Sequence, residues 1–498
     1  MTPLIYLALI LGAPAIASIV TAFTPSRSGR YVTIAAALTI LVNTLALDRY
    51  ALASGMVRRV AVVGGGYFVL DPLALWMLTV LAIVYTFISL YLAPFTLKEI
   101  EEGALDERRA RLLHSLANVF ILTMLLSVVG NNIFLLWASV EATTLASAFL
   151  VSLYGKATSL EAGWKYVVIC SVGLVFSLFG TALLYSFASR VIGAKALLWS
   201  QLVSHREALA AGFGTSLALA ALIIGYGTKA GLVPMWTWLP DAHAEAPAPI
   251  SAMLSGILIK CAFLGVVRYS MIALSLGLRE VQYLVLFMGL ASMWLAAFFI
   301  VTSRDLKRLL AFHSVENIGI SATGIGFATS LAAMGGLYHL LTHGLVKAML
   351  FLLSGAALWI YGTRDMRLMG RLLRMNRALA AVIVAGGLAL GCSPPFAMFL
   401  SSFLVAYGGL EGGYLPLVIL YIVASAIVFA GIVTHVIHIA TGEPRSEVSD
   451  SQRKRVPLAC IAVLLAMLVL ITLLGVYIPH PLRDILSYAS REFVGATH

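Results

Sequence analysis

The sequence predicts an all-α, polytopic membrane protein with about fourteen transmembrane helices, some of them discontinuous. Of its 498 residues 61% are hydrophobic and only 11% are charged, with a mean hydropathy of +0.98. A soluble chain of this length could not hide so much apolar surface. Apolar stretches follow one another along the whole chain, near residues 3–22, 31–50, 72–93, 113–129, 132–154, 163–186, 209–233, 249–272, 282–302, 305–327, 330–360, 378–408, 414–441 and 457–478. Proline-rich breaks inside two of them predict interrupted helices.

The first apolar stretch, MTPLIYLALILGAPAIAS, ends like a secretory leader. It lacks the basic segment that opens such leaders, and further apolar stretches follow at once, so it is expected to be the first transmembrane helix. Of the 33 Lys and Arg, 19 fall in the loops of one side, whereas nine fall in the loops of the other side and the C-terminal tail. The positive-inside rule then predicts that both termini lie outside and that the basic loops are cytoplasmic.

The net charge of +11 does not indicate nucleic-acid binding, because every Lys and Arg has a place in these loops or in a span. The four cysteines lie in apolar stretches without C-x-x-C spacing, so neither disulfides nor an iron–sulfur cluster is expected. The sequence contains no Walker loop, Rossmann fingerprint, nucleophile elbow or cluster of metal ligands. We therefore expect no cofactor, no metal and no catalytic centre in this chain.

The segment from Lys229 to Lys260, KAGLVPMWTWLPDAHAEAPAPISAMLSGILIK, is the most informative part of the sequence. Its prolines, including Pro234 and Pro240, predict a broken helix, which at membrane depth is tolerated only where it lines a protein-enclosed, partly hydrated path. A second break is expected at Pro394 and Pro395. Gly231 and Pro234 precede Gly391 and Pro394 by the same 160 residues, and paired breaks of this kind are typical of transporter repeats.

Several ionisable residues lie inside the apolar stretches, where each costs roughly 2.5–3.5 kcal/mol on insertion scales. Lys260 follows Pro249 by eleven residues, which places it about 16 Å into its helix, near the membrane centre. Lys229 is expected at the C-terminal end of a half-helix, where the helix dipole favours a cation. Glu141 is the only acid in its span, and we expect it to pair with Lys229 and hold that lysine charged. These three residues are predicted to carry protons.

The second half of the chain has its own set of titratable groups. His339, His343 and Lys347 share one helix face, which favours a proton relay over structural hydrogen bonding or a metal site. Glu316 is either a further proton carrier or a hydrogen-bonded structural acid, and Lys165 is either a carrier or an interfacial anchor. Arg268, near the end of a helix, is expected to snorkel to the interface.

These motifs resemble the antiporter-like subunits of respiratory complex I, most closely the hydrogenase-4 component F type found in group 4 membrane-bound [NiFe] hydrogenases. The segments that carry the resemblance are WASVEATTLASAFL, SLEAGWKYVVICSVG, the proline-rich segment ending in Lys260, DLKRLLAFHSVENIGI and HLLTHGLVKAMLFLLSGA. The resemblance implies two inverted five-helix repeats and proton translocation coupled to redox chemistry on partner subunits, in a prokaryotic cell membrane. NiFe and iron–sulfur clusters, or quinone, are then expected on those partners.

The resemblance also implies roles for single residues. Glu141 and Lys229 match a glutamate–lysine pair, Lys260 matches a central lysine, and the stripe from His339 to Lys347 matches a hydrated bridge between half-channels. One position departs from the pattern, because Ser402 stands where the family usually has Lys or Glu after the second break. About twenty residues follow the last span, so no long lateral helix of the distal complex I subunit is expected.

The expected organisation has four parts: N-terminal helices in 1–111, a first half-channel in 112–275, a second in 280–441, and a basic loop, last helix and tail in 442–498. The predicted function is proton translocation in a multisubunit redox-driven pump. Two alternatives stay open: a subunit of a multisubunit Na⁺/H⁺ antiporter, for which the lysine-rich axis is a mild objection, and a structural subunit that no longer conducts, which Ser402 motivates.

Overall fold

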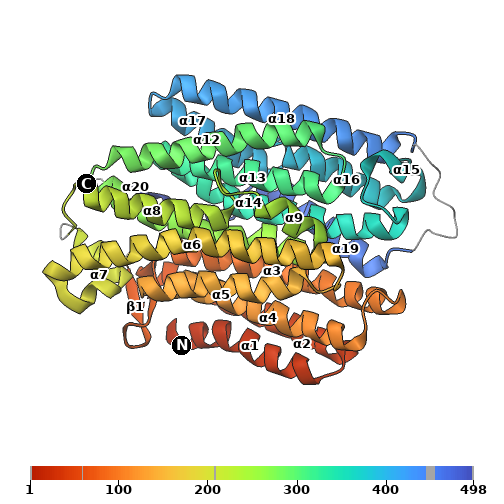
Figure 1. Cartoon of the computed structure of the whole chain (residues 1–498), viewed down its shortest axis with the longest axis horizontal. Helices are drawn as coiled ribbons and strands as arrows, with labels where there is room; N and C mark the ends of the chain where they lie inside the picture. Colours follow the sequence, from red (N-terminus) through yellow and green to blue (C-terminus); the bar gives the residue numbers. More distant parts are fainter. Residues whose placement is uncertain (1–2, 59, 207–208, 445–454, 496–498) are drawn as a thin grey trace.

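The computed structural model describes residues 3–58, 60–206, 209–444 and 455–495, which form a bundle of long, nearly parallel helices (Figure 1). The first half contains α1 (Pro3–Phe23), α2 (Ser26–Ala53), α3 (Pro72–Glu101), α4 (Glu107–Val129), α5 (Ile133–Val151), α6 (Ala157–Ile192), α7 (Trp199–Ser204), α8 (Phe213–Ala230), α9 (Trp238–Glu245), α10 (Ala248–Met253) and α11 (Ile259–Ser275). The second contains α12 (Arg279–Thr302), α13 (Leu306–Gly326), α14 (Ser330–Tyr361), α15 (Leu372–Met375), α16 (Arg377–Leu390), α17 (Ala397–Glu411), α18 (Leu415–Thr441), α19 (Leu458–Val476) and α20 (His480–Gly495).

The all-α membrane class predicted from the sequence is confirmed. Within the described residues, twelve helices are long and apolar enough to cross a membrane. Helix α13 and the interrupted pair α16–α17 occupy the two remaining apolar stretches, so every stretch expected to span is helical. The total of fourteen spans stays a prediction. The basic loop expected near 442–456 falls largely on residues 445–454, which lie outside the described part of the chain.

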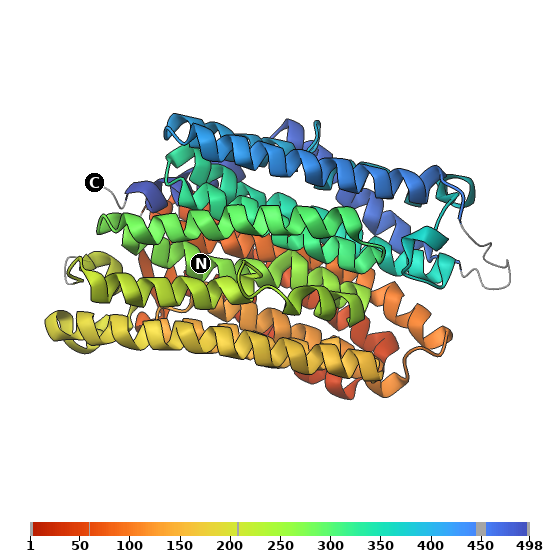
Figure 2. The same ribbon diagram turned by 45° about the horizontal axis from the view of Figure 1, so that its top comes forward.

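Helices α1 and α2 lie on one side of the bundle and α17 and α18 on the other, whereas α3 lies between them (Figure 1). Turning the molecule shows α6, α8, α12 and α18 side by side along one surface (Figure 2). The segment from α10 to α11 and helix α14 are the most buried spans. Large apolar side chains such as Phe23, Phe149 and Phe298 are exposed instead, as expected for a surface that faces lipid.

The two ends of the bundle differ in structure. At one end, which we call the hairpin face, β1 (Ala61–Val63) pairs antiparallel with β2 (Phe68–Leu70), next to α7 and α20. The 3₁₀ turns Met56–Arg58, Gly64–Gly66 and Gly193–Leu197 lie at the same end. The opposite end, which we call the loop face, carries the turn Met366–Leu368 and the short helix α15.

The first predicted break is present between α8 and α9. Helix α8 ends at Ala230, and Gly231 follows in the left-handed conformation (φ 84°) that caps a helix most easily with glycine. Pro234 lies in the non-helical link, as expected. Pro240 does not break a helix: it is the third residue of α9, in the first turn, where its missing N–H leaves no hydrogen bond unmade.

The second break separates α16 from α17 and contains Pro394 and Pro395, as predicted. Its backbone differs from the first, because the residue with positive φ is Cys392 (φ 56°) rather than Gly391 (φ −79°). A third irregularity was not predicted. The backbone forms a π-helical turn over Leu254–Leu258, directly before Lys260, and such turns are frequent at functional sites.

Candidate functional site

Lys229 lies in the last turn of α8 and is completely buried. Its ammonium donates hydrogen bonds to Thr144 Oγ1 (2.8 Å) on α5 and to the Tyr166 hydroxyl (2.5 Å) on α6. It also lies 5.8 Å from the centre of the Trp238 ring, in the first residue of α9. Three helices and the start of the broken segment therefore hold this lysine in place with neutral partners.

The predicted ion pair between Glu141 and Lys229 is wrong in its detail. Glu141 is half-buried and accepts hydrogen bonds from Ser171 Oγ (2.6 Å) and Thr144 Oγ1 (3.4 Å). Thr144 thus contacts both the carboxylate and the ammonium, and it bridges the two groups. A hydroxyl can both donate and accept, so the bridge keeps Glu141 and Lys229 in communication without direct contact.

Lys260 is buried in the middle of the molecule, in the first turn of α11. Its ammonium donates to the backbone oxygen of Ser255, inside the π-helical turn. A π-helical turn leaves carbonyl groups out of the regular i→i−4 pattern, so the local backbone supplies an acceptor at membrane depth. The Ser255 hydroxyl lies 2.7 Å from that of Ser314 on α13, which links this turn to the second half.

The three residues of the predicted stripe on α14 do lie on one buried face. The imidazole rings of His339 and His343 are stacked with their centres 5.9 Å apart. Lys347 continues the stripe, and its ammonium donates to the backbone oxygen of Leu310 on α13. All three side chains are at most 1% exposed, so the stripe is sealed from the lipid.

Glu316 belongs to a hydrogen-bonded chain that crosses from α13 to α17. Its carboxylate accepts from the Asn317 amide, and the Asn317 oxygen accepts from His339 Nε2 (2.9 Å). His339 Nδ1 in turn lies 2.8 Å from Ser401 Oγ. The hydroxyl of the neighbouring Ser402 is hydrogen-bonded to the Tyr421 hydroxyl, with the two oxygens 2.6 Å apart.

Two buried groups that the sequence analysis passed over, His243 and Lys307, join this set. His243 on α9 stacks on Phe351 (ring centres 4.7 Å apart), and neither of its ring nitrogens has a hydrogen-bond partner in the described structure. Lys260, Lys307 and Lys347 are close enough for their charges to act on it. His243 lies within the proline-rich segment. A histidine in so apolar a chain is the sequence feature that could have identified it as a site residue.

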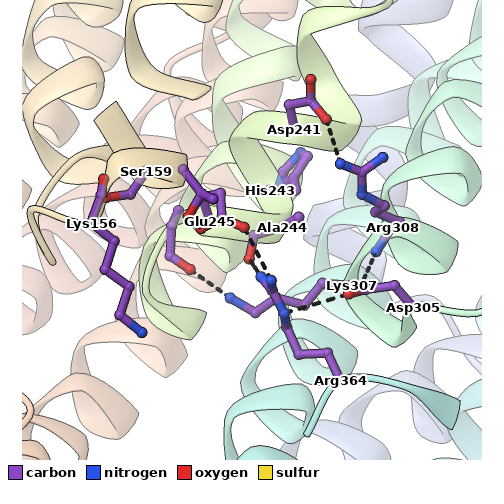
Figure 3. Close-up of polar contacts among 12 residues, drawn as sticks. Lys156, Ser159, Asp241, His243, Ala244, Glu245, Asp305, Lys307, Arg308 and Arg364 are labelled. Atoms are coloured by element: carbon purple, nitrogen blue, oxygen red, sulfur yellow. Dashed lines mark hydrogen bonds and ion pairs between the residues drawn. The ribbon is translucent and has the colours of Figure 1, made fainter. Parts of the chain in front are cut away.

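At the loop face, ion pairs and hydrogen bonds of charged residues connect α9 to the second half of the chain (Figure 3). Arg364 bonds Glu245 (3.0 Å) and the oxygen of Ala244, and it pairs with Asp305 (3.4 Å). Lys307, 5% exposed, donates to the oxygen of Ala246 (2.5 Å), where α9 gives way to α10.

On the outer side of this group Arg308 pairs with Asp241 at 2.8 Å. The same carboxylate is 3.9 Å from Lys165, which also pairs with Glu161 at 2.5 Å. The Lys165 side chain is 39% exposed, so the structure places it in this surface network and not beside Lys229.

Arg268 does not snorkel. It is fully buried, and its Nη2 pairs with Asp71 (3.2 Å) and donates to the oxygen of Val128 (3.3 Å). The guanidinium also lies 5.1 Å from the centre of the Trp199 ring, on α7. Arg268 lies inside α11, which continues to Ser275, and Trp199 of α7 covers its guanidinium.

Within the described ranges, no group of three His, Cys, Asp or Glu side chains is arranged to hold a metal ion. The site therefore consists of buried lysines, histidines and glutamates joined by hydroxyl, amide and backbone groups. Such groups can accept and release protons in sequence.

A family model described as "NADH:quinone oxidoreductase/Mrp antiporter, TM" matches residues 130–429, which is more than half of the chain. The chain belongs to this family. The match contains both breaks and the buried groups of α5, α8, α11, α13 and α14.

Among curated relatives, a hydrogenase-4 component F homolog from Methylacidiphilum infernorum is 34% identical over 420 residues, covering 83% of this chain and 86% of the relative. Two solved structures share the fold with TM-scores of 0.82, each covering 99% of this chain and 98% of the other. They are a chain of the Mrp complex from Dietzia sp. (20% identical) and a chain of the membrane-bound sulfane sulfur reductase, an archaeal respiratory membrane complex (22% identical). All three are similar to this multi-pass membrane chain over most or nearly all of its length.

Proposed function

We propose that this chain is a proton-translocating membrane subunit of a multisubunit, redox-driven complex of the hydrogenase-4 or complex I kind. The relative with the highest identity reported above is a hydrogenase-4 component F homolog. Protons move along a buried axis that begins at Glu141 and Lys229, passes His243 and Lys260, and continues along the α14 stripe. Redox chemistry, with NiFe and iron–sulfur clusters or quinone, resides on partner subunits.

The observation that carries this proposal is the burial of three lysines without a carboxylate in direct contact. Lys229, Lys260 and Lys347 are each 0% exposed, and their ammonium groups donate only to hydroxyl or backbone oxygens among the described residues. A buried cation that lacks a counter-charge is expensive, and a packed apolar side chain would stabilise the bundle better. A cost repeated three times along one axis indicates that these positions serve transport and not stability.

The two halves, 112–275 and 280–441, would each contribute a half-channel. Lys347 lies where both sets of groups act on it, since the charges of Lys260 and Glu316 both reach it. When a proton arrives at Lys229, repulsion between neighbouring cations favours transfer along the axis. The basic loop face would be cytoplasmic, in a prokaryotic cell membrane, and both termini would then lie outside.

One alternative has an observation in its favour. The fold matches a chain of the Mrp complex, and curated relatives include a subunit of an Na⁺/H⁺ antiporter from Alkalihalophilus pseudofirmus, which is 30% identical over 55% of this chain. Sodium prefers several oxygen ligands, whereas the axis is built mainly from ammonium groups, which repel a cation, and imidazole groups, which supply no oxygen. Sodium-dependent transport in the absence of redox turnover would favour exchange.

The proposal is tested by purifying the complex that contains this chain, reconstituting it in liposomes and measuring redox-driven proton uptake. Lys229→Ala should abolish proton uptake, while the redox activity of the partners persists in detergent. Lys195→Ala is the matched control, because Lys195 is an exposed lysine of the hairpin face and should not matter. Normal uptake by Lys229→Ala would make this chain a scaffold and place the proton path in a neighbour.

A further inference from the structure

The hairpin face contains a cavity that the proton axis described above does not use. Its volume is about 480 Å³, and it lies between the segment after α2, the start of α3, the end of α11, α7 and α20. Apolar side chains such as Val57 and Ile272 form much of its wall. Its charged lining comes from Arg206, Arg491 and Glu492, and Ser275 and Tyr488 add hydroxyl groups to an otherwise apolar wall.

Glu492 connects this cavity to a buried ionic group at the start of α3. Asp71 caps that helix by accepting from the amide of Ala74 (2.7 Å), and Glu492 accepts from the amide of Leu73 (3.3 Å). Arg268 pairs with Asp71 at 3.2 Å, and its charge also reaches Glu492. Both acids therefore lie at the positive end of the α3 helix dipole, and Asp71 pairs with the guanidinium of Arg268.

This arrangement suits a carboxyl group that gains and loses a proton. Burial and the nearby Asp71 carboxylate raise the pKa of Glu492 well above its usual range. Two atoms of Arg268, Nε and Nη1, are buried without a hydrogen-bond partner in the described structure, so the guanidinium has hydrogen-bond donors that the ion pair with Asp71 does not use. A fully compensated structural ion pair would have used them.

The position on α11 links the group to the axis. Lys260 and Arg268 are eight residues apart and hence lie on the same face of the helix, separated by about 12 Å along it. Lys260 is at membrane depth and Arg268 borders the hairpin face, so α11 runs from the axis to this ionic group. The second half offers no titratable side chain on α17 at Ser402, where the family resemblance leads us to expect one.

We propose that Glu492 is the proton-release group of this subunit, and that protons leave the axis along α11 through the Asp71–Arg268–Glu492 group into the cavity at the hairpin face. This inference rests on the proposed function. The charged and titratable groups that face Glu492 are Asp71 at the start of α3 and Arg268 on α11. Arg206, which follows α7, and Tyr488 and Arg491 of α20 share the cavity with it.

The test uses the intact complex in liposomes and compares Glu492→Gln with Glu492→Asp. The amide of glutamine preserves the size of the side chain and can still accept from Leu73 N–H, but it cannot carry a proton. Glu492→Gln should lower redox-driven proton transport by about 100-fold, the low end for loss of a general acid–base, with redox activity in detergent retained. Glu492→Asp should restore much of the transport and shift its pH profile. Asp484→Asn is the matched control, because Asp484 is a half-exposed acid on the same helix.

A second variant leaves the ionic group intact. Ser275→Trp would fill part of the cavity and should also slow transport, whereas Ser275→Ala should not. Proton transport at the wild-type rate in Glu492→Gln would overturn the inference. If the Glu492→Gln complex does not assemble, transport at the wild-type rate in Ser275→Trp would overturn it. Lys229→Ala distinguishes a failure of the release route from a failure of the proposed function. If Lys229→Ala abolishes transport while the Glu492 and Ser275 variants do not, only the release route is wrong. If Lys229→Ala has no effect on transport, the proposed function itself is wrong.

Discussion

The two halves of the molecule carry different side chains at their helix breaks. Ser139-Val140-Glu141 on α5 recurs 175 residues later as Ser314-Val315-Glu316 on α13, so each half has one acid at the corresponding place. In the first half the broken helix α8–α9 carries a buried ammonium, Lys229. In the second half the helix after the break, α17, presents the hydroxyls of Ser401 and Ser402.

The tyrosine residues next to the two breaks also differ in their hydrogen-bond partners. The Tyr166 hydroxyl accepts from an ammonium in the first half, whereas the Tyr421 hydroxyl exchanges a hydrogen bond with Ser402 in the second. A lysine changes its charge when a proton passes, whereas a serine can only relay one. Under the proposed function, we infer from this difference that the first break stores protons, and that storage in the second half depends on α14 and Glu316.

Among the substitutions that test this comparison, we expect the largest loss of proton uptake at Lys347. Lys347→Met keeps an apolar stem of similar length but removes the cation on which Lys260 and Glu316 both act. Redox-driven proton uptake should fall by about 100-fold or more, since a carrier without a replacement interrupts the axis. Lys307→Met, a buried lysine at the loop face, serves as comparison and should be milder. Equal, small effects would mean that the second half stores no protons on α14.

Ser402→Glu sharpens the comparison, because it gives the second break the charge that the family pattern has there. Tyr421 lies close enough to donate to the new carboxylate, as it now bonds Ser402 Oγ at 2.6 Å. We expect proton transport to rise about two- to tenfold if release limits the rate. The isosteric control Ser402→Gln should leave the rate unchanged, and a rise in both variants would point to packing instead of charge.

Thr144→Val should lower proton uptake, but by less than Lys347→Met does. Valine has nearly the same shape, but it removes the hydroxyl that joins Lys229 to Glu141. Losing one buried hydrogen-bond partner costs about 1–3 kcal/mol, equivalent to roughly a five- to hundredfold change in rate if the whole cost falls on transfer. Thr143→Val, at the adjacent buried threonine, removes a hydroxyl that donates to its own helix and is the control. Proton uptake at the wild-type rate in Thr144→Val would show that Glu141 and Lys229 act separately.

Much of the site could be predicted because it depends on residue type and spacing along a helix. Proline positions located both breaks, and the i, i+4, i+8 spacing placed His339, His343 and Lys347 on one face. Depth along a helix identified Lys229 and Lys260 as buried cations.

What could not be predicted depends on contacts between distant segments. Arg268 is covered by α7 and α20, which are distant from it in the sequence, so its position near a helix end was misleading. The Thr144 bridge depends on side-chain geometry across three helices. Pro240 was predicted to break a helix because the sequence does not show where the preceding link ends and α9 begins. In the structure Pro240 lies in the first turn of α9, where proline is tolerated.

The measurement that tests the central claim most directly compares Lys229→Met with Ser402→Ala in the same liposome assay of redox-driven proton uptake. Both residues are buried and hydrogen-bonded to a tyrosine hydroxyl, Lys229 at the first break and Ser402 at the second. We predict that Lys229→Met abolishes proton uptake and that Ser402→Ala retains it nearly in full. Persistent uptake in Lys229→Met, or its loss in Ser402→Ala, would contradict the assignment of proton storage to the first break.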